Sequence, residues 1–583
     1  MMEKLLQALA PVHAAPLSAE DAADQRQEAE QACNRERLMQ QDNDAAFPAE
    51  TVAWLNRQGA QLLYLPAQHG GKLRGLEQIT QLWRALAGID LTVAIGHGKT
   101  FLGAVCVWLG GTPQQIAQIR QALLAHEPLA WGLTERGRGA DLMATQTTAT
   151  RQASGWRLQG EKWLINNATR GHIITVLANT GDAPGGARNL SVLLVDTRRL
   201  PPGCWRHLDK VNTYGIRGAD ISGQRWQDAP LPAEALVGEA GQGLELTLRA
   251  LQLTRTACCG LSVGALDAGI KLTLELVQQH RLYGRRMIEL DTVQALLAES
   301  TTVAWLSEVT AWVAARHAGY LPQEMSVISA LAKAAIPSLV AQQLTRLEEQ
   351  MGARGFVSDL YAGGAFQKLI RDHQIVPIFD GSTIVNRVAL VPQLPTLIRH
   401  FKKGTADLAA LDQLAQLDAP QPEALPLASL TIFSRNGCSL VQALPALIER
   451  LQQRHAEAAE EMGLNALLGE LLRVSRQTVD ELATAPLAWP AVPQPVLQGL
   501  QRYEWLFIAA CCLLFWLNNP ALQHAPGRRR HWLPLCLYLI ARHLDLAAGP
   551  EQHAAWPSLK QSFAEHPCGD DDTLLSQGAH HER

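Results

Sequence analysis

The chain has no large excess of charge of either sign. Its 51 Lys and Arg residues nearly balance its 55 Asp and Glu residues, and the formal net charge of the 583-residue chain is −4. Proteins that follow a phosphate backbone carry a basic patch or stripe, so this composition disfavours nucleic acid as a partner. The length is enough for two to four domains, each with a sizeable core.

Cysteines at metal-binding or redox spacing are also missing. The ten cysteines lie far apart or as adjacent pairs, with no Cys-x-x-Cys motif. That motif is the one used by structural zinc sites and by thioredoxin-like centres. We therefore predict reduced, mostly buried thiols and no metal site.

The sequence lacks an apolar stretch long enough for secretion near its start, and acidic residues interrupt the first segment. We therefore expect a cytoplasmic protein. The most apolar window, 503–520, has an uncharged run from Trp505 to Leu517, which is shorter than the roughly 20 residues of a spanning helix. A buried core helix is the favoured interpretation, and interfacial membrane contact through this C-terminal region is the alternative.

Three kinds of sequence pattern follow one another along the chain. Apolar residues recur at helical spacing over 1–128, and short runs rich in Val, Ile, Leu and Trp alternate with Gly, Asn and Asp over 129–238. Long alanine-rich helical segments then return over 239–400. The predicted fold class is mainly α with a central β domain: an N-terminal helical domain, a middle β domain and a helical bundle.

A Pro-rich segment, DAPQPEALP (418–426), resembles a linker and precedes another helical stretch. We predict an all-α C-terminal domain over 418–565, separate from the bundle, that supports a dimer or a partner surface. The polar residues 566–583 are expected to form a disordered tail.

Several glycine-rich and charged motifs follow one another between about residues 45 and 400. They are LTERGRGAD (133–141), GWRLQGEKWLINNA (155–168), LTRTACCGLSVGALDAG (253–269), HRLYGRRMI (280–288), EQMGARGF (349–356) and RDHQIVPIFDGST (371–383). In kind and order they resemble the motifs of the acyl-CoA dehydrogenase family. The resemblance implies that family's fold, with a middle β-barrel-like domain between two helical domains, plus an additional C-terminal helical domain.

The resemblance also implies FAD as the cofactor and assigns roles to particular residues. By it Asp380 is the catalytic base, and Arg255, Ala140 and Gly381 contact the substrate. The residues that it places at the cofactor are Leu133, Thr134, Leu164, Ile165, Asn166, Arg281, Tyr283, Glu349, Gly352 and Ser382. Of these, Arg281 and Tyr283 lie in the segment that reaches the cofactor of a neighbouring subunit in the family.

The chain departs from the family pattern at several of these positions. The family's base is usually Glu rather than Asp, Trp and Thr are common where Leu164 and Asn166 stand, Ala140 replaces Ser, and Glu349 replaces Gln. Some relatives carry the base on the helix beside the arginine, but that position is Thr254 here, which cannot act as a carboxylate. Judged from the residues alone, Asp380 could instead cap the Gly-Ser-Thr turn.

Oxidation of an acyl thioester between Cα and Cβ needs a base for the α-proton and an acceptor for the β-hydride, and no ordinary side chain accepts hydride. The resemblance implies an enzyme that converts an acyl-CoA or an acyl carrier protein thioester into a trans-2-enoyl thioester. It further implies a homodimer and a separate electron acceptor similar to an electron-transfer flavoprotein.

Two alternatives stay open. The Asp in place of Glu and the extra domain would also fit a flavin-dependent oxidation of a carrier-bound intermediate in secondary metabolism. The atypical residues Leu164, Asn166 and Glu349 would fit a catalytically inactive relative that serves as a binding protein.

Overall fold

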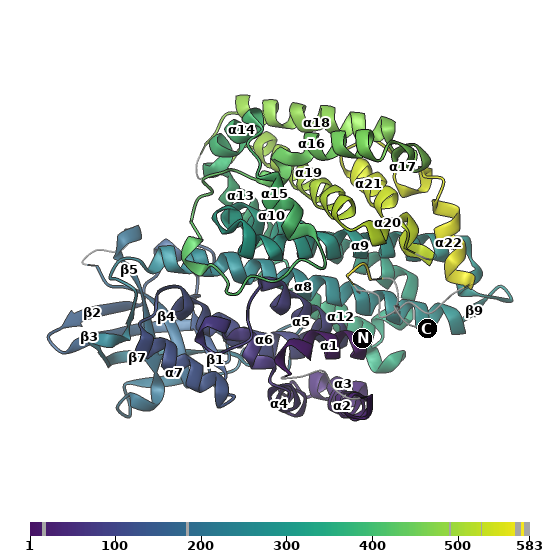
Figure 1. Cartoon of the computed structure of the whole chain (residues 1–583). Helices are drawn as coiled ribbons and strands as arrows, with labels where there is room; N and C mark the ends of the chain where they lie inside the picture. Colours follow the sequence, from purple (N-terminus) through teal and green to yellow (C-terminus); the bar gives the residue numbers. More distant parts are fainter. Residues whose placement is uncertain (14–18, 182–185, 489–490, 526, 566–572, 576–583) are drawn as a thin grey trace. The chain divides into compact units, whose positions relative to one another are not determined.

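The computed structural model describes residues 1–13, 19–181, 186–488, 491–525, 527–565 and 573–575. They form two compact units, residues 1–254 with 422–428, and residues 255–421 with the described residues from 429 onward. Helices precede and follow a central sheet (Figure 1), which confirms the predicted fold class. The residue bounds expected for four separate domains stay predictions.

The first unit consists of helices followed by strands. Its helices are α1 (Met2–Leu9), α2 (Ala19–Ala32), α3 (Arg35–Asn43), α4 (Ala49–Arg57), α5 (Leu76–Ile89), α6 (Leu91–Gly110) and α7 (Pro113–Leu124). Its strands are β1 (Leu129–Gly132), β2 (Thr148–Gln152), β3 (Gly155–Asn166), β4 (Ile173–Asn179), β5 (Leu190–Asp196), β6 (Trp205–Leu208), β7 (Ile221–Pro232) and β8 (Leu236–Val237).

The strands form one mixed sheet in the order β6-β7-β3-β2-β4-β5-β8, with β1 paired in parallel to β4. Large apolar side chains such as Trp156 and Trp226 fill its core. Helix α6 packs against β1 through Gly103, where a Cβ would lie 2.5 Å from the Cβ of Leu129. Only glycine allows so close an approach, and the sheet is thereby joined to the N-terminal helices.

The described residues of the second unit are helices and loops apart from one short hairpin, β9 (Arg281–Leu282) and β10 (Arg285–Arg286). Helix α8 (Gly243–Gln279) contributes its residues from Arg255 onward. The other helices are α9 (Asp291–Tyr320), α10 (Met325–Met351), α11 (Ala353–Phe356), α12 (Ala365–His373), α13 (Thr383–Leu390), α14 (Leu394–Lys403), α15 (Leu408–Ala415), α16 (Ser439–Arg454), α17 (Ala456–Glu461), α18 (Asn465–Thr484), α19 (Gln494–Asn518), α20 (Pro520–Gln523), α21 (Trp532–His543) and α22 (Trp556–Glu565).

Helix α19 lies at the centre of this unit (Figure 1), where it contacts α9, α10, α13, α16, α18 and α21. Each residue from Trp505 to Trp516 is at most 9% exposed, which confirms the predicted buried core helix. By length and composition alone, four described helical segments could cross a membrane: Leu91–Gly110, Gly243–Gln279, Pro322–Met351 and Gln494–Asn518. In the last of these, 83% of the apolar window is buried inside the protein.

The C-terminal helices pack with the bundle as one unit, and the boundary expected at the Pro-rich segment stays a prediction. One buried contact between the two regions is made by Glu324, just before α10. Its carboxylate accepts hydrogen bonds from the backbone N–H (2.8 Å) and the hydroxyl (2.5 Å) of Ser439, the first residue of α16. Of the expected disordered tail, all but residues 573–575 lie outside the described residues.

Replacement of Glu324 by Gln should change how stability depends on pH. Burial raises the pKa of Glu324 from 4.5 to about 7, opposed by the Ser439 hydrogen bonds. Because the folded-state pKa is the higher one, the stabilisation that this proton provides is complete below pH 4.5 and is lost as the pH rises through 7. The wild-type protein should therefore lose about 3 kcal/mol relative to Glu324→Gln between pH 4.5 and 8.

Urea unfolding of both proteins across this pH range measures the difference. Glu457→Gln, on the exposed side of α17, is the control and should follow the wild-type profile. Parallel profiles for wild type and Glu324→Gln would show that the buried carboxyl group does not take up a proton in this range.

Candidate active site

Asp380 lies on the loop that joins α12 to α13. Its backbone has φ +55°, and the φ of Gly381 is +98°. Glycine adopts positive φ freely and Asp does so more readily than most other residues, but the Asp380 conformation still needs support from its surroundings. Asp380 is half-buried, whereas Ile378, two residues before it, is 60% exposed.

Two cations, the half-buried Arg255 and the buried Lys333, supply that support through backbone carbonyl groups. The guanidinium Nε of Arg255, on α8, donates to the carbonyl oxygen of Asp380 at 2.7 Å. The ammonium group of Lys333, on α10, donates to the carbonyl oxygens of Val376 (2.7 Å) and Gly381 (3.4 Å), and Lys333 is 0% exposed. Burial lowers the pKa of Arg255 to about 10, opposed by the charge of Asp380, and burial also lowers the pKa of Lys333.

The carboxylate of Asp380 has a contact of its own. The thiol of Cys258, one helical turn after Arg255 on α8, lies 3.5 Å from Oδ2 and can donate to it. The N-cap of α13 is Ser382, whose hydroxyl accepts from the N–H of Val385 at 3.4 Å. The helix therefore does not need Asp380 as its cap.

In the β domain, a buried ion pair holds the glycine-rich loop against strand β3. The ammonium group of Lys162 lies 2.7 Å from Glu135 Oε1 and 3.0 Å from the carbonyl oxygen of Leu133. Glu135 also accepts from the hydroxyl of Thr147 at 2.7 Å. Burial acts to raise the pKa of Glu135, but Lys162 and these hydrogen bonds outweigh burial, so that the pKa is lowered.

The contacts of Lys162 and Glu135 hold together two segments that the sequence resemblance assigns to the flavin, the glycine-rich loop and strand β3. The carbonyl oxygen of Thr134 accepts from the N–H of Trp163, next to Leu164. Leu164 has φ +61° and is 39% exposed, and the pairing of β3 with β7 shifts register there. Ile165 is buried, and the buried Oδ1 of Asn166 has no hydrogen-bond partner among the described residues.

Five other predicted site residues lie at exposed positions of the chain. Arg281 and Tyr283 are on the β9–β10 hairpin, and Tyr283 is 94% exposed. Glu349 is exposed on the last turn of α10, and Gly352, which follows the helix, has φ +58° and open space where a Cβ would stand. Ala140 is exposed on the loop between β1 and β2. The roles assigned to these residues stay predictions.

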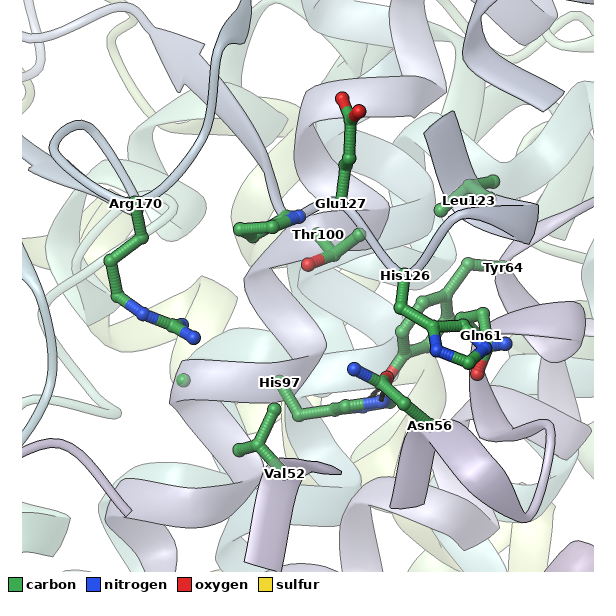
Figure 2. A pocket seen from close by; sticks show the side chains of 12 residues that line it. Val52, Asn56, Gln61, Tyr64, His97, Thr100, Leu123, His126, Glu127 and Arg170 are labelled. Carbon is green, nitrogen blue, oxygen red and sulfur yellow. Dashed lines mark hydrogen bonds between the residues drawn. The ribbon is translucent and has the colours of Figure 1, made fainter. Parts of the chain in front are cut away.

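A small cavity in the first unit contains a histidine, a residue type that often acts as a general base. It measures about 30 Å³, and Figure 2 shows His97 in it between Tyr64 and Asn56. The ring Nδ1 of His97 lies 2.7 Å from the Tyr64 hydroxyl, and Nε2 lies 3.3 Å from Asn56 Oδ1. Burial lowers the pKa of His97 to about 3. The ring is therefore neutral and has hydrogen-bond partners on both nitrogens, as expected of a structural histidine rather than a general base.

Lys333 is a site residue that the sequence motifs did not reveal. It is the only charged residue in the stretch MSVISALAKAAIPSLVAQQL, residues 325–344. Charged residues are rarely buried unless they are paired, so a lone lysine in an apolar helix could have pointed to a buried acceptor. Which acceptor it meets is decided by a loop more than 40 residues later in the chain.

Comparison with known proteins identifies the family. The chain matches "Acyl-CoA dehydrogenase, middle domain" over residues 130–228 and "Acyl-CoA dehydrogenase, C-terminal domain" over residues 241–392. The probable acyl-CoA dehydrogenase FadE25 of Mycobacterium tuberculosis is 26% identical over 356 residues, which are 60% of this chain and 88% of that protein.

Solved structures share the fold. An acyl-CoA dehydrogenase complexed with FAD from Bacillus anthracis aligns with a TM-score of 0.64 at 17% identity, over 95% of this chain and 90% of that one. The prolyl acyl carrier protein oxidase AnaB aligns with a TM-score of 0.55 at 16% identity, over 65% of this chain and 99% of that one. The chain belongs to the acyl-CoA dehydrogenase family of FAD-dependent oxidoreductases.

The residues of the β domain fit a flavin. The Asn166 Oδ1 offers a buried acceptor that lacks a partner within the described part of the chain, and Leu164 presents an exposed apolar side chain beside it. Thr134, half-buried on the adjoining loop, adds a hydroxyl. These groups could hold a ring that has both apolar faces and N–H donors on its edge.

Replacement of Lys162 by Met should disorganise this loop. The change would leave Glu135, which is 6% exposed, as a buried charge without its cation, at a cost of about 3–5 kcal/mol. We expect a lower free energy of unfolding in urea and a lower FAD content in the purified protein.

The matched control is Arg225→Met, which removes one of the two arginine partners of Glu161, the neighbour of Lys162. The side chain of Arg225 is 53% exposed, and such pairs contribute at most about 1 kcal/mol. Equal losses in the two variants would mean that burial of the Lys162–Glu135 pair has no special importance.

Proposed function

We propose that this enzyme oxidises an acyl thioester between Cα and Cβ to a trans-2-enoyl thioester, with Asp380 as the base that removes the α-proton. The observation that carries the proposal is the way in which the loop is held. Arg255 and Lys333 bind carbonyl oxygens on both sides of the Asp380 side chain, and the Cys258 thiol contacts its carboxylate. A base is effective when its carboxylate stays in one position relative to the proton that it removes.

The residues of this chain supply the proton transfer and the positioning of the substrate. FAD, when bound, supplies the hydride acceptor that no side chain can provide. Asp380 takes the α-proton, so that the substrate loses one proton and one hydride in total. Arg255 and Lys333 bind carbonyl oxygens next to Asp380, so their positive field should stabilise negative charge that develops on a substrate beside this residue.

The carrier of the acyl group is a second part of the proposal. We favour an acyl-CoA, because relatives such as FadE25 are described as acyl-CoA dehydrogenases. An acyl carrier protein thioester is the second candidate, since AnaB, an acyl carrier protein oxidase, shares the fold. The electrons would leave through a separate acceptor similar to an electron-transfer flavoprotein.

A homodimer is also proposed, and the exposed apolar side chains of the second unit support it. Tyr283 is 94% exposed, Phe356 is 81% exposed and Leu360 is 60% exposed. Large apolar groups that are exposed together often mark an interaction surface. Tyr283 lies in the motif that resembles the family's segment at the cofactor of a neighbouring subunit, so a second copy of the chain would cover it.

Replacement of Asp380 by Asn should abolish the proton transfer without disturbing the loop. Asn is nearly isosteric and also adopts the left-handed conformation readily. We expect the variant to keep FAD and to bind substrate, but to lose at least about 10³-fold in the rate of flavin reduction. Anaerobic mixing with a panel of acyl-CoA and acyl carrier protein thioesters measures this rate as bleaching of the flavin absorbance.

Asp228 provides the control, because it is another Asp with positive φ (+50°) and its side chain is 72% exposed on β7. Asp228→Asn should reduce its flavin at the wild-type rate. Asp380→Glu adds information on the substrate. A higher rate on simple acyl-CoAs would indicate that Glu suits such substrates better than Asp does, and a lower rate would indicate that the site requires the shorter side chain of Asp. If Asp380→Asn reduces its flavin as fast as the wild type, Asp380 is not the base.

Replacement of Tyr283 by Ala should weaken both the dimer and FAD retention. Aromatic side chains buried at the centre of an interface commonly contribute 2 kcal/mol or more, so we expect dimer dissociation to become at least about tenfold easier. Sedimentation analysis and the flavin spectrum measure the two effects. Phe433→Ala, at an aromatic residue that is 54% exposed elsewhere in the unit, should change neither; equal behaviour of the two variants would argue against an interface at the hairpin.

A further inference from the structure

A buried ion pair joins the helix that follows the Asp380 loop to the central C-terminal helix. Arg387, on α13, binds both carboxylate oxygens of Glu504, on α19: Nε lies 2.6 Å from Oε1, and Nη2 lies 2.8 Å from Oε2. Glu504 is 2% exposed. Such two-point binding between a guanidinium and a carboxylate fixes orientation as well as distance.

Helix α13 is in turn bound to the loop. Asn386, the residue before Arg387, is 0% exposed, and its Nδ2 donates to the carbonyl oxygens of Gly381 (2.8 Å) and Ser382 (3.0 Å). The hydroxyl of Thr383 lies 2.8 Å from that of Ser338 on α10. A rotation or shift of α13 would therefore move the backbone next to Asp380.

The chemical surroundings of Glu504 make an ion pair at this place costly. It stands directly before the uncharged run 505–517 in the core of the unit. An apolar pair of similar volume could pack there without the loss of hydration that a buried charge suffers. Apolar contacts have no direction, however, whereas this pair allows one orientation of α13 on α19.

We propose that Glu504 is a positioning residue for the dehydrogenation: through Arg387 it fixes helix α13 and, with it, the loop that holds Asp380. The inference rests on the proposed function of Asp380. Arg255 and Lys333 hold the loop from α8 and α10, and α13 holds it from its C-terminal side. The family match ends at residue 392, so this part of the support for the catalytic loop comes from the region of the chain beyond the matched domains.

The test compares full-length, FAD-loaded variants in anaerobic flavin reduction with saturating acyl-CoA. Glu504→Gln keeps the shape of the side chain but loses its charge. We expect a reduction rate lower by about 10-fold to 100-fold, as for a small displacement of a catalytic group, with the substrate Kd within about threefold of the wild-type value. Hydrogen exchange of the amides of residues 377–390 should become faster in the same variant.

Two further variants distinguish an effect on the position of the Asp380 loop from an effect on the stability of the protein. In Arg387→Gln/Glu504→Gln no charge is left buried alone, so the protein should regain stability relative to Glu504→Gln and yet keep the slow reduction rate. Asp412→Asn breaks another two-point pair of this unit, in which Arg450 binds Asp412 at 2.8 and 3.2 Å. It should lower stability but leave the reduction rate within about twofold of wild type.

The outcomes are distinct. A Glu504→Gln rate within twofold of wild type with unchanged hydrogen exchange overturns the proposal, and so does an equal loss of rate in Asp412→Asn. If Glu504→Gln does not fold, the reduction rate and hydrogen exchange of Arg387→Gln/Glu504→Gln decide the question by the same criteria. If Asp380→Asn is as fast as wild type, the proposed function fails instead, and the hydrogen-exchange difference between Glu504→Gln and Asp412→Asn still decides whether the pair holds the loop.

Discussion

The candidate active site depends on two cations that bind backbone carbonyl oxygens. Lys333 and Arg255 bind peptide groups on both sides of the Asp380 side chain. The positive φ of Asp380 is costly for a non-glycine residue and would be less well held without these contacts. The positive charges thus have two roles, since they fix the loop and create the electrostatic surroundings of the proposed base.

A similar arrangement is found elsewhere in the protein: a buried charged group lies where two elements meet. Lys162 and Glu135 join the glycine-rich loop to β3, Glu324 binds the first residue of α16, and Glu504 binds α13. Each of these groups is at most 6% exposed, and a charge left at such a place without its partner would be costly. We infer that this chain uses buried polar contacts to fix orientation at junctions that apolar packing alone would leave free to slide.

The choice of Asp rather than Glu at the position of the proposed base agrees with the backbone that carries it. Asp is more frequent than other non-glycine residues at positive φ, because its short side chain can bond to the nearby backbone. The loop conformation and the residue type therefore support each other. The shorter side chain in turn requires the substrate to approach more closely, and the helices beyond the family match help to hold the loop in place.

The sequence by itself determined the class of fold, the order of its parts and the motif that contains Asp380. Those features are local: apolar spacing selects helix or strand, and glycine and short polar residues mark the turns. The buried core helix at 505–517 was predictable for the same reason. The tertiary structure alone decided which distant residues meet. Nothing near Lys333, Glu504 or Glu324 in the sequence indicates a partner, because each partner lies between about 40 and 120 residues away. A buried charge is stable only beside its partner, and that pairing exists only once the helices have packed.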